Sequence, residues 1–314
     1  MSDFISRIGY ATRLNSFRGG SSKTNVLDLI KRASKVRGLG FVDLNYPEHV
    51  DTFGSRDIGK SLKNCGLTLN SVEMRYNKLK SKFGLLALSS KSARERNEAV
   101  NQTLRAIDCL DSLGGSTLTL WPSLEGYDYQ YQIDYYNSYT RLVDSLKKIC
   151  LYNKSINISL EFKPNDLYSY SLIPNLASSI ILAKDIGVKN VGLTLDFCHL
   201  LMSGESPAAS ADNAFNKCRV FGIHLNDGYG RRDDGLMVGS IHPIKTLEML
   251  SVIYKNKFSG VIYFDTFPTY IDPVEECERN IKFTNHALKL ISTKRTPDIM
   301  RTLYSNKIFS KFRK

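Results

Sequence analysis

Eight short runs rich in β-branched and aromatic residues recur along this 314-residue chain. They span residues 8–11, 40–45, 67–74, 116–121, 155–162, 190–196, 219–226 and 260–266. Stretches with apolar residues at helical spacing lie between them, at 26–36, 93–113, 139–152, 173–185, 243–254 and 273–291. This alternation predicts parallel strands joined by right-handed crossovers, and eight units of about 35 residues close into a barrel more readily than they extend an open sheet. The expected fold is therefore α/β, a (β/α)₈ TIM barrel.

One domain, residues 1–293, and a basic C-terminal extension, residues 294–314, are predicted. The extension carries seven Lys and Arg residues against one acid, Asp298, and so holds half of the net charge of +12. A weak helix is expected at 297–312. No nucleic-acid motif or aromatic stacking platform accompanies these charges, so solubility or packing is expected here rather than nucleic-acid binding. No glycine-rich phosphate loop follows the first strand, which argues against a dinucleotide-binding fold.

The cysteines and the apolar runs indicate a cytoplasmic protein. The six cysteines lie far apart with no Cys-x-x-Cys pair, as expected of free thiols. No apolar run approaches the roughly 20 residues of a membrane span, and the N-terminus is polar and charged, unlike a signal peptide. We therefore expect no membrane partner.

Potential metal ligands stand at or near the ends of the last four predicted strands: Glu161, Asp196, His224 and Asp265. Strand ends of a barrel face a common mouth, so these side chains can converge although 35, 28 and 41 residues separate them. Three carboxylates and one imidazole suit a hard to borderline divalent ion, with Mn²⁺ expected first and Co²⁺, Mg²⁺ or Zn²⁺ as alternatives. Any one of these acids could instead be a satisfied polar group, but four in succession favour a metal site.

The motifs around these residues carry a family resemblance: Glu161-Phe162-Lys163-Pro164, Asp196-Phe197-Cys198-His199, residues 224–241 and Phe264-Asp265-Thr266. Through them residues 8–291 resemble the xylose isomerase-like barrel superfamily of sugar isomerases and epimerases, with the closest likeness to the L-rhamnose isomerase type. The resemblance implies that the four ligands hold a metal ion that grips two substrate oxygens. It also implies a sugar or sugar phosphate as substrate and a homo-oligomer, a dimer or tetramer.

Further roles follow from the same resemblance. It implies Glu161, Lys163, His199 and Asp265 as catalytic residues, and His199 with Asp233 as ligands of a second metal site. The family has a third acid where this chain has Gly235, which weakens that second site. Substrate contacts are expected from Lys163, from Asn45 in a mouth loop, and from Trp121, whose ring face suits sugar carbons or else belongs to the core.

A family histidine is missing from the loop after the third strand. The aligning stretch, residues 84–90, contains none of the five histidines of the chain. Either the substrate is short or acyclic, so that ring opening is unnecessary, or catalytic power is reduced.

The expected function is a divalent-metal-dependent sugar isomerase that interconverts an aldose and a ketose, or their phosphates. Ketose 3-epimerases of the same superfamily are the alternative; they typically place Glu at the last ligand position, where this chain has the shorter Asp265. A catalytically silent sugar-binding barrel is a third reading. A metal-dependent phosphodiesterase is disfavoured because such enzymes need more histidines at strand ends.

Overall fold

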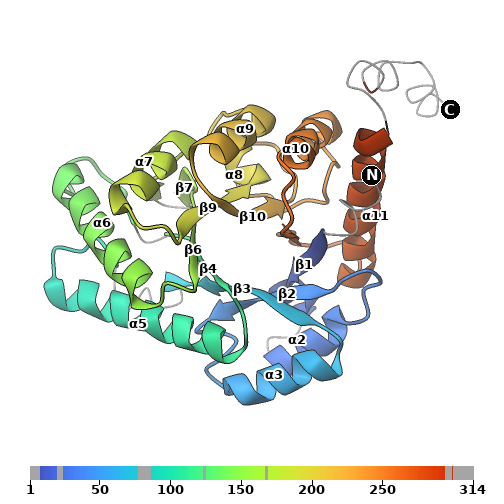
Figure 1. Ribbon diagram of the computed structural model, residues 1–314, viewed down its shortest axis with the longest axis horizontal. Coiled ribbons are helices and arrows are strands. Elements are labelled where there is room, and N and C mark those ends of the chain that lie inside the picture. The colour runs from blue at the N-terminus through green and yellow to red at the C-terminus, as the bar shows by residue number, and fades with distance from the viewer. Residues whose placement is uncertain are drawn as a thin grey trace.

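Eight parallel strands close into a barrel in the computed structural model, which describes residues 8–19, 24–76, 86–122, 125–166, 169–293 and 299 (Figure 1). The strands are β1 (Gly9–Arg13), β2 (Phe41–Tyr46), β3 (Thr68–Met74), β4 (Thr117–Leu120), β6 (Asn157–Glu161), β9 (Val191–Asp196), β10 (Val220–Leu225) and β11 (Val261–Phe264). The closed order β1-β11-β10-β9-β6-β4-β3-β2 follows the chain around the ring. The predicted fold class is confirmed.

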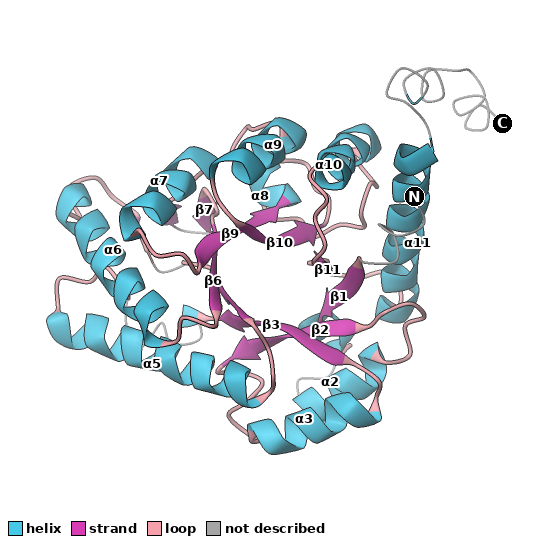
Figure 2. Cartoon of the chain, viewed as in Figure 1, coloured by secondary structure: helices cyan, strands magenta, loops and turns pink. Residues whose placement is uncertain are grey.

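Helices surround the ring of strands on the outside (Figure 2). They are α2 (Val26–Ala33), α3 (Ser55–Asn64), α5 (Ala93–Ser112), α6 (Tyr135–Tyr152), α7 (Leu176–Ile186), α8 (Phe197–Met202), α9 (Pro207–Lys217), α10 (Pro243–Lys255) and α11 (Pro273–Thr293), with a 3₁₀ turn η1 (Leu14–Arg18) after β1. Periodicity predicted six of these helices but missed α3, α8 and α9. The reason is their weak apolar signal: α3 buries only Ile58 and Leu62, and α8 is six residues long. Helix α7 starts at Leu176, later than predicted, because Asn175 forms a capping box with Ser178.

Strand register decides which side chains point into the barrel. Residues paired in parallel strands point to the same face, and the face alternates along each strand. Glu161 pairs with Thr194, two residues before Asp196, and Asp196 pairs with His224. His224 in turn pairs with Tyr263, two residues before Asp265. The four predicted ligands therefore share the inner face of the barrel.

The main hydrophobic core lies between the strands and the helices. Outward-facing residues such as Leu118, Ile158, Leu193 and Ile223 are fully buried there. The inner face is polar by contrast, with buried hydroxyl pairs such as Ser159 Oγ to Thr194 Oγ1 at 2.6 Å. A polar interior walled by an apolar layer can hold charged side chains because it offers them hydrogen-bond partners.

A small antiparallel sheet stands apart from the barrel and was not expected from the sequence. It consists of β5 (Gly126–Tyr127), β8 (Ser169–Ser171) and β7 (Asn165–Asp166), in that order. Two of its strands follow β6 closely, and the third follows β4. It therefore ties together the loops after two neighbouring barrel strands.

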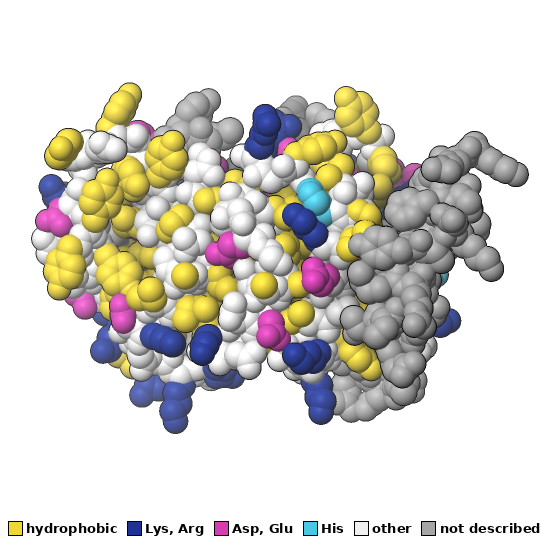
Figure 3. Space-filling model, turned by 90° about the horizontal axis from the view of Figure 1, so that it is seen from above, with side chains coloured by type: hydrophobic (Ala, Val, Ile, Leu, Met, Phe, Trp, Pro, Cys, Tyr) yellow, Lys and Arg dark blue, Asp and Glu magenta, His cyan; other side chains and the backbone are white. Residues whose placement is uncertain are grey.

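The predicted C-terminal extension and its helix lie outside the described residues, apart from the buried Ile299. Among the helices that are described, none is long and apolar enough to cross a membrane. On the face drawn in Figure 3, basic side chains occur in small, separated groups with acidic side chains among them.

Candidate metal centre and active site

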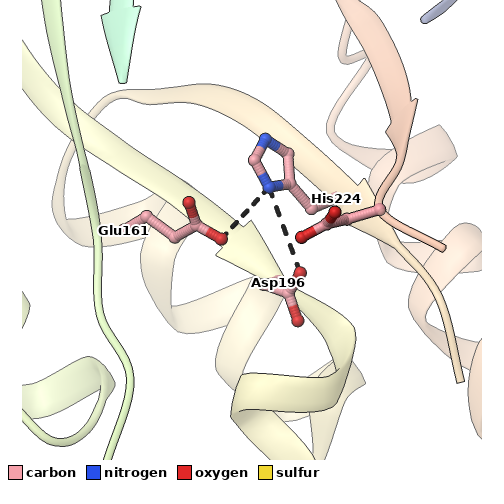
Figure 4. Close-up of side chains that lie close together, drawn as sticks. Glu161, Asp196 and His224 are labelled. Carbon is pink, nitrogen blue, oxygen red and sulfur yellow. Dashed lines mark hydrogen bonds and ion pairs between the residues drawn. The ribbon is translucent and has the colours of Figure 1, made fainter. Parts of the chain in front are cut away.

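Glu161, Asp196, His224 and Asp265 meet at the C-terminal end of the barrel. Each offers one ligand atom, and these atoms all lie within 4.8 Å of one another. The Nδ1 atom of His224 lies 3.1 Å from Oε1 of Glu161 and 4.0 Å from Oδ2 of Asp196 (Figure 4). All four residues are buried, the most exposed being Asp265 at 8%. The barrel thus brings together the four side chains that the sequence marked as ligands.

A second group lies beside the first. His199, on α8, places Nδ1 3.5 Å from Glu161 Oε1 and Nε2 3.4 Å from Asp233 Oδ2. The Lys163 ammonium also donates to Asp233 Oδ2, at 3.1 Å. His199 therefore contacts the four-residue cluster, and Asp233 and Lys163 are joined to it through His199.

These residues fit a divalent cation. Asp265 Oδ1 is buried and accepts no hydrogen bond among the described residues; its nearest cation is Arg13, whose Nε lies 3.6 Å away. His199 Nδ1 and Asp233 Oδ1 are likewise buried without hydrogen bonds to the part of the chain that is described. Buried carboxylate oxygens without hydrogen bonds, such as Asp265 Oδ1 and Asp233 Oδ1, are costly unless a cation binds them. Glu161, Asp196, His224 and Asp265 would hold the ion.

Two more carboxylates lie behind His224. Ligand atoms of Asp43, Glu73 and His224 also fall within 4.8 Å of one another, and all three residues are buried. A carboxylate beside a metal-binding imidazole orients its ring and makes it more basic. We infer that Asp43 and Glu73 support His224 from within the barrel.

The cluster shifts the protonation of its members in the metal-free protein. Burial alone would lower the pKa of His224, but the charge of Glu161 and its hydrogen bond raise that pKa to about 10. Burial would likewise lower the pKa of His199, but the negative charges of Asp196 and Asp233 raise it to about 9. Burial raises the pKa of Asp265 to about 7.

We expect the metal-free protein to lose stability as the pH rises from 6.5 to 9. In this range folded His199, His224 and Asp265 bind more protons than they do unfolded, because their pKa values are raised. Stability falls with pH wherever the folded state binds more protons. Urea unfolding in the presence of a chelator at several pH values measures the slope.

His199→Gln should reduce this slope, whereas His286→Gln, at an exposed site on α11, should leave it unchanged. A metal-free stability that is constant or rises between pH 6.5 and 9 would contradict the expected proton uptake by the folded cluster.

A cavity of about 570 Å³ opens above the cluster. Glu161, Lys163, His199, Asp233 and Asp265 line it. Trp121, one of the predicted substrate contacts, lines it too. The cavity therefore joins the metal-binding and catalytic candidates in one space large enough for a monosaccharide.

Asn45, predicted to contact substrate, is placed differently. It is 4% exposed and does not line this cavity. Its side-chain oxygen accepts from Arg75 Nε at 3.3 Å, and its backbone N–H donates to His49 Nδ1 at 3.0 Å. Asn45 thus supports a residue of the cavity wall, because its strand register points it into the barrel below the mouth.

The segment that lacks the family histidine is held by a buried carboxylate. Glu125 accepts the backbone N–H groups of Ala87, Leu88 and Ser89 at 3.2, 2.6 and 3.0 Å. These three residues are buried, and none of them lines the cavity. Among the described residues of that loop, 86–90, none lines the cavity and so none takes the place of the family's histidine there.

Sequence reasoning gave no role to four arginines of the cavity wall, Arg13, Arg75, Arg231 and Arg232, of which the first two follow a simple pattern. Arg13 ends β1, and Arg75 directly follows β3. The criterion that found the acids, a polar residue at a strand end, applies equally to both. It was applied only to the last four strands, whose acids form a recognisable ligand set.

Comparison with protein families decides the wider assignment. Residues 30–286 match the model of the xylose isomerase-like TIM barrel family. The chain belongs to that family. The superfamily expected from the sequence motifs is confirmed.

Two curated proteins are similar in sequence to this xylose isomerase-like barrel. A probable sugar isomerase of Mesorhizobium japonicum is 23% identical over 269 residues, which cover 81% of this chain and 60% of the relative. The D-psicose 3-epimerase of Agrobacterium fabrum is 24% identical over 180 residues, which cover 55% and 59%. The chain spans about three fifths of the length of these relatives.

Solved structures share the fold over nearly the whole chain. A D-tagatose 3-epimerase-like protein superposes with a TM-score of 0.74 at 17% identity, covering 91% of this chain and 98% of its own. The IOLI protein with a bound zinc atom gives a TM-score of 0.66 at 17% identity, covering 92% and 100%. The closest likeness expected from the motifs, to L-rhamnose isomerases, is not supported, because the relatives found are ketose 3-epimerases and a probable sugar isomerase.

Proposed function

We propose that this barrel is a divalent-metal-dependent enzyme that rearranges a sugar beside its carbonyl group, and that its reaction is epimerisation of a ketose at C3. The observation that carries the proposal is the convergence of Glu161, Asp196, His224 and Asp265, of which Glu161 and Asp265 line one polar cavity. The relative from Agrobacterium fabrum, a D-psicose 3-epimerase, and the likeness to a D-tagatose 3-epimerase-like protein support this choice of reaction.

The residues of the cavity suit proton transfer next to a carbonyl group. A divalent ion held by the cluster would supply Lewis acidity, which makes the neighbouring C–H bond more acidic. Glu161 and Asp265 enter the site from β6 and β11, strands separated in the barrel by β9 and β10. One carboxylate can take the C3 proton while the other returns a proton to the opposite face. Such an exchange inverts C3.

The remaining polar residues would orient the sugar. Lys163, tied to Asp233, donates its remaining N–H groups toward a hydroxyl or carbonyl oxygen. His199 contacts both Asp233 and Glu161, and so links the proton-transfer residue to the sugar-binding lysine. Alignment of the reacting carbon with a fixed base accounts for much of the rate in reactions of this kind.

Aldose–ketose isomerisation is the second candidate. Asp265 is one carbon shorter than the glutamate typical of the epimerases, and Lys163, His199 and Asp233 form a further polar group beside the first. The relative from Mesorhizobium japonicum, a probable sugar isomerase, supports this reading. Both candidate reactions would use the same divalent ion. We propose Mn²⁺ as that ion, and Zn²⁺, Co²⁺ and Mg²⁺ are the alternatives to compare with it.

The test is product analysis in D₂O with a panel of ketoses and aldoses. Protein loaded with each ion is incubated with D-fructose, D-tagatose, D-psicose and L-rhamnose, the ion is removed on a chelating resin, and the sugars are examined by NMR. We expect inversion at C3 with deuterium at that carbon. An aldose product assigns the isomerase instead. Sugar binding without any conversion would overturn the proposed activity and favour a silent barrel.

A further inference from the structure

Arg75 is a basic residue of the cavity wall that the proposed mechanism does not use. The residue follows β3 directly and lines the cavity wall. Its guanidinium carbon lies 5.2 Å from the ring centroid of Trp121, and the Lys163 ammonium lies 4.9 Å from the same centroid. The indole therefore serves as a platform that orients two cations of the cavity wall.

The guanidinium is fixed on its other side by polar residues of the barrel interior. Nη2 forms an ion pair with Glu73, and Nε donates to Asn45 Oδ1 at 3.3 Å. The Arg75 side chain is 15% exposed. Glu73, Asn45 and Trp121 therefore hold a largely buried guanidinium group in one orientation. A binding group held this way loses little conformational entropy when it meets its ligand.

One end of the guanidinium remains for a ligand. No described residue accepts a hydrogen bond from Arg75 Nη1, although this nitrogen carries two N–H groups. Because Glu73 already balances the positive charge, the group is suited to donate to neutral oxygen atoms rather than to act as the counterion of a strong anion. Hydroxyl groups of a sugar are such acceptors.

Two other basic residues of the cavity wall are balanced in the same manner. Lys163 pairs with Asp233, and the Nε atom of Arg232 lies 2.7 Å from Asp234 Oδ1. A cavity whose described lysines and arginines are largely matched by acids offers little net attraction to a dianion such as a phosphate ester. The charge pattern thus agrees with a neutral ligand at Arg75.

We propose that Arg75 is a substrate-binding residue that determines sugar specificity, with Nη1 donating to a hydroxyl group of the bound sugar. The proposal rests on the proposed function only in assigning a sugar to this cavity. Arg75 cannot replace an imidazole as a proton carrier, because its guanidinium stays charged throughout the accessible pH range. Its role is therefore in binding, and its removal should affect KM far more than kcat.

The experiment uses the single tryptophan of the chain as reporter, because Trp121 lies next to Arg75. Metal-loaded protein is titrated with D-fructose, D-tagatose and D-psicose while the fluorescence is recorded, and KM and kcat are measured for any sugar that is converted. Arg75→Lys keeps a positive charge beside Glu73 but loses the planar guanidinium group and its Nη1 donor. We expect Kd and KM to rise about tenfold, with kcat changed less than threefold.

The matched control is Arg37→Lys, at an exposed ion pair with Glu278 far from the cavity, which should change neither constant. A second variant, Trp121→Phe, shrinks the platform; its sugar affinity, measured by calorimetry, should fall about threefold. Circular dichroism and the metal affinity of each variant are compared with those of the wild type, so that loss of folding is seen directly.

The outcomes separate this inference from the proposed function. Unchanged Kd and KM in a folded Arg75→Lys protein would overturn the role of Arg75 while leaving the enzyme assignment intact. A fall in kcat alone would also overturn it, because it would place Arg75 behind Glu73 and His224 as a support of the cluster. If the variant bound sugar more weakly but the wild type showed no turnover, the binding role of Arg75 would be supported and the proposed enzymatic activity would be refuted. No response to any of the three sugars would refute both.

Discussion

Replacing Glu161 with glutamine is expected to lower sugar conversion by about 10³-fold, since one substitution removes both a proposed metal ligand and a proposed proton carrier. Glutamine has nearly the same shape, so the buried site stays filled. It carries no charge, however, and the carboxylate that now lies 3.1 Å from His224 Nδ1 is lost. Initial rates with the sugar identified in the panel, together with metal titration by calorimetry, measure the two effects.

A suitable control is Glu275→Gln at the exposed start of α11, where the one ion pair of the carboxylate within the described residues is with Arg279. This variant should keep wild-type rates and metal affinity. If Glu161→Gln retained more than a tenth of wild-type activity, Glu161 would be neither the base nor an essential ligand, and the proposed mechanism would be wrong.

Removing the metal ion should abolish turnover and lower the melting temperature by several degrees. Any ligand that binds only the folded state stabilises it, by about 4 kcal/mol when its concentration is 1,000 times Kd. Without an ion, the carboxylates of Glu161, Asp196 and Asp265 lie close together in a buried space, where their charges repel. Thermal unfolding and activity are followed before and after chelation, and again after adding back each divalent ion.

Glu161→Gln supplies the internal control, because a protein that has already lost its metal affinity should show little further change on chelation. Full recovery on adding back Mn²⁺ or Zn²⁺ would exclude irreversible damage. Activity and melting temperature that both withstand exhaustive chelation would show that neither turnover nor stability depends on a metal ion, and the metal-dependent mechanism would be wrong.

The fold was open to prediction because it follows from local periodicity. Alternating apolar residues mark strands, three- and four-residue spacing marks long helices, and eight regular units leave the barrel as the simplest closure. Short helices escaped for the same reason, since α3 buries only two apolar residues and α8, with six residues, is too short to show a period. The small sheet β5-β8-β7 escaped because strands of two or three residues have no period at all.

The candidate ligands were also visible in the sequence. In a parallel barrel, a polar residue at the end of any strand must face the same mouth, so four strand-end positions imply one site before any coordinate is known. Glu161, Asp196, His224 and Asp265 meet this condition, and the structure places them together.

Only the tertiary structure decided how the rest of the cavity is built. The contact between Lys163 and Asp233 spans 70 positions of the chain, and the pairing of Arg75 with Glu73, Asn45 and Trp121 depends on strand register and side-chain packing. Periodicity and strand-end chemistry are local properties that a sequence carries directly. The path of a loop and the partner of a buried charge are set by contacts between distant segments, and these exist only once the chain has folded.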